Sequence, residues 1–440
     1  MTVGAFPQSA FLARRQRVMD SIGDGVMVLP AAPTLFRAGD SALSYRPDSE
    51  LFYLTGFIEP DAVLVLRGFA KERRSVLFSR PRDPDAERWT GPRAGPEQAR
   101  AFVGVDEARS IDRLDQELAG LLEGADRVFF RLGKDARTEL LVRSALQAAR
   151  AKGARRGVGP RGVMDPGVIL DELRLRKDPF EVEAIRAAAR ITVEGFRAAF
   201  AHTQAGMGEW EVQAELEAAF RRLGAAGPAF ATIVGSGENG CVLHYVDNSR
   251  RMEDGDLVLI DAGAEAGMYS GDVSRTAPVS GRFSPEQREV YQVVERARRL
   301  ALEAIRPGVR ISEVHAEVVR SMVHGLCGLG VLSGAEEELL EAGACSAFFP
   351  HRTSHWLGLE THDVGDYAQA GESIKLEPGM VLTIEPGLYF APGPESGAFE
   401  GIGIRVEDDV LVTKDGGEVL SAGLPTDPDE VASLIGTGSG

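Results

Sequence analysis

The stretch DLVLIDAGAEAGMYSGDVSRTAP, residues 256–278, decides the fold of the second half of the chain. It predicts one strand over 256–264 and a second over 268–278, because two apolar runs flank a glycine-containing turn. Asp261 ends the apolar run of the first strand and Asp272 lies on the second, so a tight hairpin places the two carboxyl groups side by side. A carboxylate buried alone is costly, which indicates that these two share a partner.

Two further predicted strands carry acidic residues in apolar surroundings. The segments 380–389 and 403–412 contain Glu385 and Glu407, and a loop rich in proline and glycine joins them. Because side chains alternate between the two faces of a strand, Arg405 points to the same face as Glu407.

Four helices are predicted around these strands. The first begins after the N-cap Asp178, and the others cover 208–223, 285–305 and 311–329. The second half is therefore expected to be α+β, with helices packed on a mainly antiparallel sheet. Residues 1 to about 152 instead alternate short apolar strands with helices, which predicts an α/β domain, and the segment that follows, rich in glycine, proline and arginine, predicts a linker.

The carboxylates and one histidine predict a metal site. His355 belongs to PHRTSHWLGLETHDVG, residues 350–365, which also holds His351 and His362. Two divalent cations balance four carboxylates in charge, and the imidazole adds a neutral fifth ligand; this donor set favours Mn²⁺, with Co²⁺ or Zn²⁺ as alternatives. The predicted ligands are Asp261, Asp272, His355, Glu385 and Glu407.

Two such ions share a hydroxide nucleophile and clamp a tetrahedral intermediate, so the site predicts a hydrolase. The alternative is four separate structural acids, each paired with an arginine or a helix cap. That alternative requires each of the four buried carboxylates to have a separate partner within one domain. His244, in GENGCVLHYVDN (237–248), follows a glycine-rich turn and is a candidate partner for the substrate or for an oxyanion.

Composition restricts the partners and the compartment. A net charge of −17 disfavours nucleic-acid binding through a basic face. The three cysteines, Cys241, Cys327 and Cys345, have no CxxC spacing, which indicates a reducing compartment. No apolar stretch approaches the roughly 20 residues of a membrane helix. The sequence thus predicts a cytoplasmic enzyme without nucleic-acid or membrane partners.

Taken in order, these segments resemble the metal-dependent aminopeptidase P and prolidase family. The first half adds SYRPDSELFYLTGFIEPDAVLVL (44–66), which looks like the N-terminal domain of bacterial aminopeptidase P. Besides the opening stretch, the matching segments include TIVGSGENGCVLHY (232–245), SHWLGLETHDVG (354–365), LEPGMVLTIEPGLY (376–389) and GIGIRVEDDVLVT (401–413).

The resemblance implies an N-terminal α/β domain over 1–172 and an α+β pita-bread catalytic domain over 173–440. It implies a dinuclear-metal aminopeptidase that releases the N-terminal residue from peptides with proline second, by attack of a metal-bridging hydroxide on the Xaa-Pro carbonyl. It also implies a homo-oligomer, a dimer or tetramer. The alternatives are an Xaa-Pro dipeptidase (prolidase) and a non-catalytic pita-bread binding protein; the second is disfavoured because all five ligand positions are filled.

The resemblance also distributes roles. Asp261 would hold one metal, His355 and Glu385 the other, and Asp272 and Glu407 would bridge. The residues implied to line the substrate site are His244, His351, His362 and Tyr389.

Catalytic roles are then expected for several of these side chains. Glu385 moves a proton from the nucleophile to the leaving amine, and His244 or His362 donates to the developing oxyanion. Arg405 orders Glu407 and keeps it ionised, because a nearby cation lowers a carboxyl pKa. His351 contacts the substrate, and Arg352 beside it departs from the family pattern, which often has glycine there.

Overall fold

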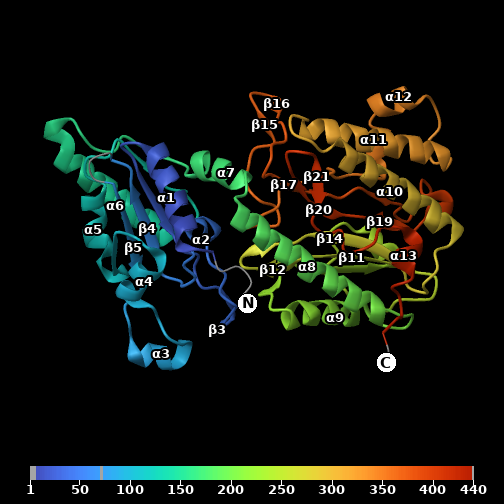
Figure 1. Ribbon diagram of the computed structural model, residues 1–440, viewed down its shortest axis with the longest axis horizontal. Coiled ribbons are helices and arrows are strands. Elements are labelled where there is room, and N and C mark those ends of the chain that lie inside the picture. The colour runs from blue at the N-terminus through green and yellow to red at the C-terminus, as the bar shows by residue number, and fades with distance from the viewer. Residues whose placement is uncertain (1–5, 70–72, 439–440) are drawn as a thin grey trace. The chain divides into compact units, whose positions relative to one another are not determined.

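The computed structural model describes residues 6–69 and 73–438 and forms two compact units, Phe6–Leu173 and 174–438 (Figure 1). Residues 1–5, which the sequence assigns to the first domain, lie outside the described residues. None of the described helices is long and apolar enough to cross a membrane.

The first unit is built on a mixed six-stranded sheet in the order β6-β5-β4-β1-β7-β8. The two central pairings, β1 with β4 and β4 with β5, are antiparallel, and β6, β7 and β8 join in parallel. Every residue of β1 and β4 is buried, so both faces of the sheet are covered. The strands are β1 (Val26–Pro30), β4 (Val63–Arg67), β5 (Arg74–Ser79), β6 (Glu107–Ser110), β7 (Arg127–Phe129) and β8 (Gly162–Met164).

Helices and a small hairpin complete this unit. Apolar side chains of α5 and α6 pack with alternate residues of β1, β4 and β5 in one core cluster. The helices are α1 (Gln8–Ile22), α2 (Ser49–Thr55), α3 (Pro84–Thr90), α4 (Gly95–Val103), α5 (Leu114–Leu121) and α6 (Ala136–Gly153), with the hairpin β2 (Phe36–Ala38) and β3 (Ser41–Ala42). The predicted α/β class is confirmed.

The segment after residue 152 is not the linker that its composition suggested. Its first part forms β8, which pairs in parallel with β7 as the edge strand of the sheet, and it continues into α7 (Gly167–Leu175). An edge strand needs only one hydrogen-bonded neighbour, so a short run of three residues suffices there.

The second unit contains two pairs of helices and several small antiparallel sheets (Figure 1). One core cluster joins α8 and α9 to β10, β11 and β14; another joins α10 and α11 to β17–β20. The helices are α8 (Pro179–His202), α9 (Glu209–Arg222), α10 (Pro285–Ala304), α11 (Ile311–Gly328), α12 (Glu336–Glu341) and α13 (Pro428–Ala432). The sheets have the orders β10-β11-β14, β13-β12-β9, β17-β20-β21, β18-β19 and β15-β16. Their strands are β9 (Gly227–Pro228), β10 (Ile233–Ser236), β11 (Leu257–Ala262), β12 (Ala264–Ala266), β13 (Tyr269–Ser270), β14 (Val273–Pro278), β15 (Ala368–Gln369), β16 (Glu372–Ser373), β17 (Val381–Ile384), β18 (Gly387–Tyr389), β19 (Gly403–Arg405), β20 (Asp408–Val412) and β21 (Gly417–Val419).

Sequence and structure agree closely for the four predicted helices of this unit, whereas the short helices α12 and α13 were not predicted. The Asp178 carboxylate caps α8 by accepting a hydrogen bond from the backbone N–H of Glu181. The Glu181 carboxylate in turn accepts a hydrogen bond from the backbone N–H of Asp178. This reciprocal pair fixes the start of the helix where the sequence placed it. The prediction of helices packed on antiparallel strands is confirmed.

Candidate metal centre

Two acidic residues come from the first half of the second unit. In β11 (Leu257–Ala262), Asp261 lies opposite Ser274 of the antiparallel β14 (Val273–Pro278). Asp272 directly precedes β14. The predicted hairpin is present, but its arms are interrupted, since β12 (Ala264–Ala266) and β13 (Tyr269–Ser270) belong to a separate sheet.

The other two acids lie where predicted strands break. Glu385 follows β17 (Val381–Ile384), and the next residue, Pro386, has no N–H for a ladder. Glu407 lies between β19 (Gly403–Arg405) and β20 (Asp408–Val412), and its N–H donates to the Ser274 carbonyl at 3.0 Å. The predictions of continuous strands over 380–389 and 403–412 are therefore wrong at these positions.

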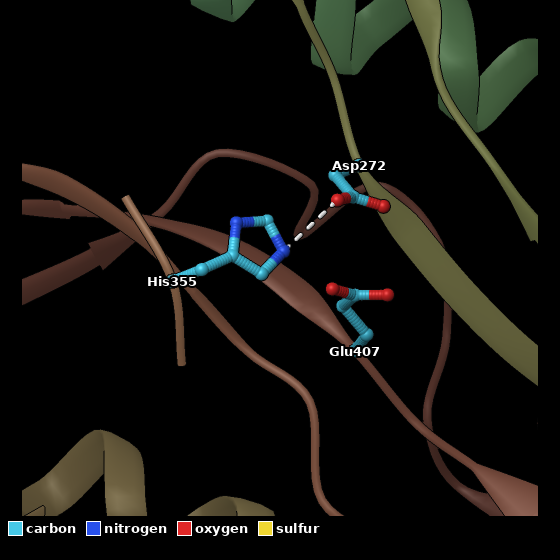
Figure 2. Close-up of side chains that lie close together, drawn as sticks. All are labelled: Asp272, His355 and Glu407. Carbon is cyan, nitrogen blue, oxygen red and sulfur yellow. Dashed lines mark ion pairs between the residues drawn. The ribbon is translucent and has the colours of Figure 1, made fainter. Parts of the chain in front are cut away.

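His355 joins two of these acids in a compact cluster (Figure 2). Ligand atoms of Asp272, His355 and Glu407 all lie within 4.8 Å of one another, and His355 Nε2 is 3.3 Å from Asp272 Oδ2. The backbone N–H of His355 donates to the Thr383 hydroxyl at 3.1 Å, and its Nδ1 lies 3.1 Å from the Trp356 carbonyl, which leaves Nε2 facing the carboxylates.

The two remaining predicted ligands border this cluster. Glu385 Oε1 is 3.9 Å from His355 Nε2. Asp261 Oδ2 is 2.5 Å from Arg405 Nη2, whereas its Oδ1 is buried and has no hydrogen-bond partner among the described residues. A buried carboxylate oxygen without a partner is unfavourable, and a cation at this point would satisfy it. The donor set therefore fits divalent metal ions.

The electrostatics of the site also favour the binding of divalent metal ions. Burial, then the charges of Asp261 and other nearby carboxylates, raises the pKa of Asp272 well above its usual value. Glu407 shows the same shift, caused by burial and then by Asp272. Burial raises the pKa of Glu385 to about 7. These carboxylates repel one another, and bound cations would relieve that repulsion.

The expected role of Arg405 towards Glu407 needs correction. Arg405 lowers the pKa of Glu407, but burial and the neighbouring acids outweigh it. Arg405 forms its ion pair with Asp261. Among the described residues, Ser274 links Arg405 to Glu407: the serine hydroxyl accepts a hydrogen bond from Arg405 Nε at 2.9 Å and donates one to Glu407 at 2.7 Å.

Arg405 also begins a chain of hydrogen bonds that fixes His351. Its Nη1 donates to the Tyr389 hydroxyl at 2.9 Å, and that hydroxyl lies 2.8 Å from His351 Nε2. His351 Nδ1 lies 2.8 Å from the Arg352 carbonyl, which can only accept, so we assign the proton to Nδ1. Burial lowers the pKa of His351 to about 4, consistent with a neutral ring.

Two further predicted histidines lie at the exposed side of the cluster. The ring centroid of His362 is 4.4 Å from that of His355, in an edge-to-face arrangement. Burial, then the charges of His355 and His244, lowers the pKa of His362, which brings His244 into the same neighbourhood. Both side chains are exposed, so a ligand can reach them.

Sequence reasoning missed three supporting residues. Ser274 links Arg405 to Glu407, and Thr383 orients His355. Asp409 is fully buried, and both of its oxygens lie 3.2 Å from the backbone N of Asp272. The pairing of Asp261 with Ser274 would have pointed to the serine, but only once the strand register was known.

Buried carboxylates, an imidazole facing them and an unsatisfied oxygen define the class of protein: a metal-dependent hydrolase. Comparison with family models assigns residues 183–414 to "Metallopeptidase family M24" and residues 11–129 to "Aminopeptidase P, N-terminal domain". The chain belongs to metallopeptidase family M24, and the predicted pita-bread catalytic domain is confirmed.

Known relatives extend over nearly the whole chain. The chain is 45% identical to the Xaa-Pro aminopeptidase of Escherichia coli over 97% of both chains. It is 31% identical to human Xaa-Pro aminopeptidase 3, over 98% of this chain and 87% of the human one.

Among solved structures, a variant of Escherichia coli aminopeptidase P in complex with substrate matches with a TM-score of 0.93 and 44% identity, over 98% of both chains. Aminopeptidase PepP of Pseudomonas aeruginosa matches with a TM-score of 0.94 and 42% identity, also over 98% of both chains.

Proposed function

We propose that the chain is an Xaa-Pro aminopeptidase, which releases the N-terminal residue from peptides that have proline in second position. The observation that carries this proposal is the similarity to Xaa-Pro aminopeptidases over 97% of the chain, which includes both domains. We assign residues 1–172 to the N-terminal domain and 173–440 to the catalytic domain.

The proposed cofactor is a pair of divalent cations, with Mn²⁺ preferred. Asp261 would hold one ion, His355 and Glu385 the other, and Asp272 and Glu407 would contribute to both. When bound, the cations polarise a carbonyl oxygen and lower the pKa of water. The unsatisfied oxygen of Asp261 and the raised pKa values of Asp272, Glu385 and Glu407 support this assignment.

Side chains of the protein carry out the proton transfers and bind the substrate. Glu385, which borders the cluster, takes up a proton from the nucleophile and delivers it to the proline nitrogen, which leaves as a secondary amine. His362 and His244 are exposed beside the cluster and donate to the oxyanion. Tyr389 and His351 form one wall of the substrate site, held in place by Arg405.

A product analysis tests the proposal against its nearest alternative. The Mn²⁺-loaded chain is incubated with Ala-Pro-Ala-Ala, with Ala-Ala-Ala-Ala and with the dipeptide Ala-Pro, and the products are identified by mass spectrometry. Release of alanine from the proline tetrapeptide, and little from the all-alanine one, is the expected result. Cleavage of the dipeptide alone would favour a prolidase, and no cleavage of any peptide would contradict both.

The proposal includes a cytoplasmic location and a homo-dimer or tetramer. Support for the location is that Cys241, Cys327 and Cys345 are free thiols. Light scattering on the purified chain tests the oligomeric state, and a monomer at micromolar concentration would contradict it.

A further inference from the structure

A cavity of about 400 Å³ adjoins the metal centre on the side of α11. His315 and Val319 of α11 form one wall, and Phe349, His351 and Arg352 form another. Binding sites for small molecules and short peptide segments typically have about 300–1,000 Å³. The cavity is thus large enough for one or two amino-acid residues.

The charge of this cavity is positive. None of its lining residues is acidic, and Arg352 is exposed and makes no ion pair in the part of the chain that the structure describes. His315 Nδ1 lies 2.8 Å from the Thr353 hydroxyl. Burial, and then the charge of Arg352, lowers the pKa of His315 and so favours its neutral form. Arg352 is therefore the lining residue with a permanent positive charge.

His351 borders both the cavity and the acidic cluster. His351 lines the cavity, and its Nδ1 is only 3.5 Å from Glu385 Oε2. The hydrogen bond from His351 to the Arg352 carbonyl ties these two residues together. A peptide held at the acidic cluster can therefore extend past His351 towards Arg352.

Charge decides which end of the peptide extends into the cavity. The substrate of an aminopeptidase has a positively charged N-terminus, which the cation of Arg352 repels. The opposite end of a short peptide has a carboxylate, and acidic side chains add further negative charge. The cavity accordingly fits the residues that follow proline.

We propose that this cavity binds the peptide segment after proline and that Arg352 selects substrates with a carboxylate on the residue that follows proline. The inference rests on the proposed Xaa-Pro aminopeptidase activity. The carboxylate has two sources, the free C-terminus of a tripeptide and an acidic side chain.

Matched peptides measure this selectivity. On the Mn²⁺-loaded chain, kcat/KM is compared for Ala-Pro-Ala against its amide, and for Ala-Pro-Glu-amide against Ala-Pro-Gln-amide. The variants are Arg352→Gln, Arg352→Gly and Arg352→Lys. Arg282→Gln is the control, since Arg282 is also exposed, makes no ion pair among the described residues and does not line the cavity.

The native chain is expected to prefer the carboxylate peptide of at least one pair by about three- to tenfold, mainly through KM, as suits one charge-assisted contact at an exposed site. Arg352→Gln and Arg352→Gly abolish the preference, whereas Arg352→Lys retains part of it and Arg282→Gln all of it. The pair that responds identifies the source of the carboxylate. Equal kcat/KM within both pairs, or a preference that survives in Arg352→Gln, would overturn the inference.

A binding measurement separates this inference from the proposed function. Calorimetry compares the dipeptide Pro-Ala, which has the form of a reaction product, with Pro-Ala-amide on the native chain and on Arg352→Gln. If no peptide is cleaved but Pro-Ala binds more tightly than its amide, and only when Arg352 is present, the proposed activity fails and the carboxylate site stands. If peptides are cleaved without any carboxylate preference, the activity stands and the site fails.

Discussion

Binding of divalent cations to the metal centre is expected to release protons, and fewer protons at higher pH. Burial and mutual repulsion raise the pKa values of Asp272 and Glu407, and burial raises that of Glu385. Raised carboxyl pKa values mean that the metal-free site holds protons, whereas carboxylate ligands bind metal in their ionised form. Raising the pH therefore strengthens metal binding.

Glu385 gives the scale of the effect. With a pKa of about 7, it holds about 0.9 proton at pH 6 and about 0.1 at pH 8. It alone should make the number of released protons differ by about 0.8 between these pH values. Each released proton also makes the apparent affinity for metal rise by up to about tenfold per pH unit. The pKa values of Asp272 and Glu407 are also raised, so these groups contribute to the protons released.

Calorimetric titration of the metal-free chain with Mn²⁺ measures the proton count. The titration is repeated at pH 6 and pH 8 in two buffers of different ionisation enthalpy, and the difference in apparent enthalpy between buffers gives the number of protons. A release that is larger at pH 6 is the expected result. Release that is zero at both values, or equal at both, would refute the electrostatic account of the site.

Three further variants test other parts of the structure. Asp363→Asn removes the carboxylate that pairs with the buried cations Lys177 and Arg174, of which Arg174 also lies 3.4 Å from Glu360, and should cost about 3 kcal/mol in urea unfolding at pH 7. Burial opposes ionisation of Asp363, but these cations lower its pKa, so the stabilisation is expected to disappear only as the pH falls through that lowered value. A loss below about 1 kcal/mol would contradict this. His362→Ala should lower kcat while metal content stays unchanged, and unaltered kinetics would remove its role. Tyr389→Phe should lower activity about tenfold or more with metal retained, because His351 loses its hydrogen-bond donor; full activity would show that this hydrogen bond is dispensable.

Local patterns were sufficient to predict most of the elements. The capping residues of α8 and the apolar runs of β1, β4 and β5 are properties of short segments; α8 begins where the sequence placed it, and the first unit has the predicted alternation of strands and helices. Strand ends were harder. Pro386 marks the break after Ile384 in the sequence itself, but the break before Asp408 depends on contacts with distant residues. The Glu407 N–H, for instance, bonds to Ser274 on another sheet.

In the candidate site, too, local patterns revealed some residues, and contacts between distant residues determined others. Its acidic residues were recognisable because charged side chains in apolar runs are unusual. The partner of Arg405 was not recognisable, because strand alternation indicated Glu407, whereas in the folded chain Arg405 pairs with Asp261. Asp409 was missed for a similar reason, because its contact with the Asp272 backbone joins residues 137 positions apart.

Anomalous diffraction from crystals grown with Mn²⁺ tests the central claim most directly. The account predicts two peaks in the second unit, both coordinated by Asp272 and Glu407, with Asp261 at one and His355 and Glu385 at the other. It also predicts that Glu407→Ala loses both peaks or retains one weak peak in an unchanged fold. Absence of a peak at these residues in the native chain, at saturating Mn²⁺, would contradict the account.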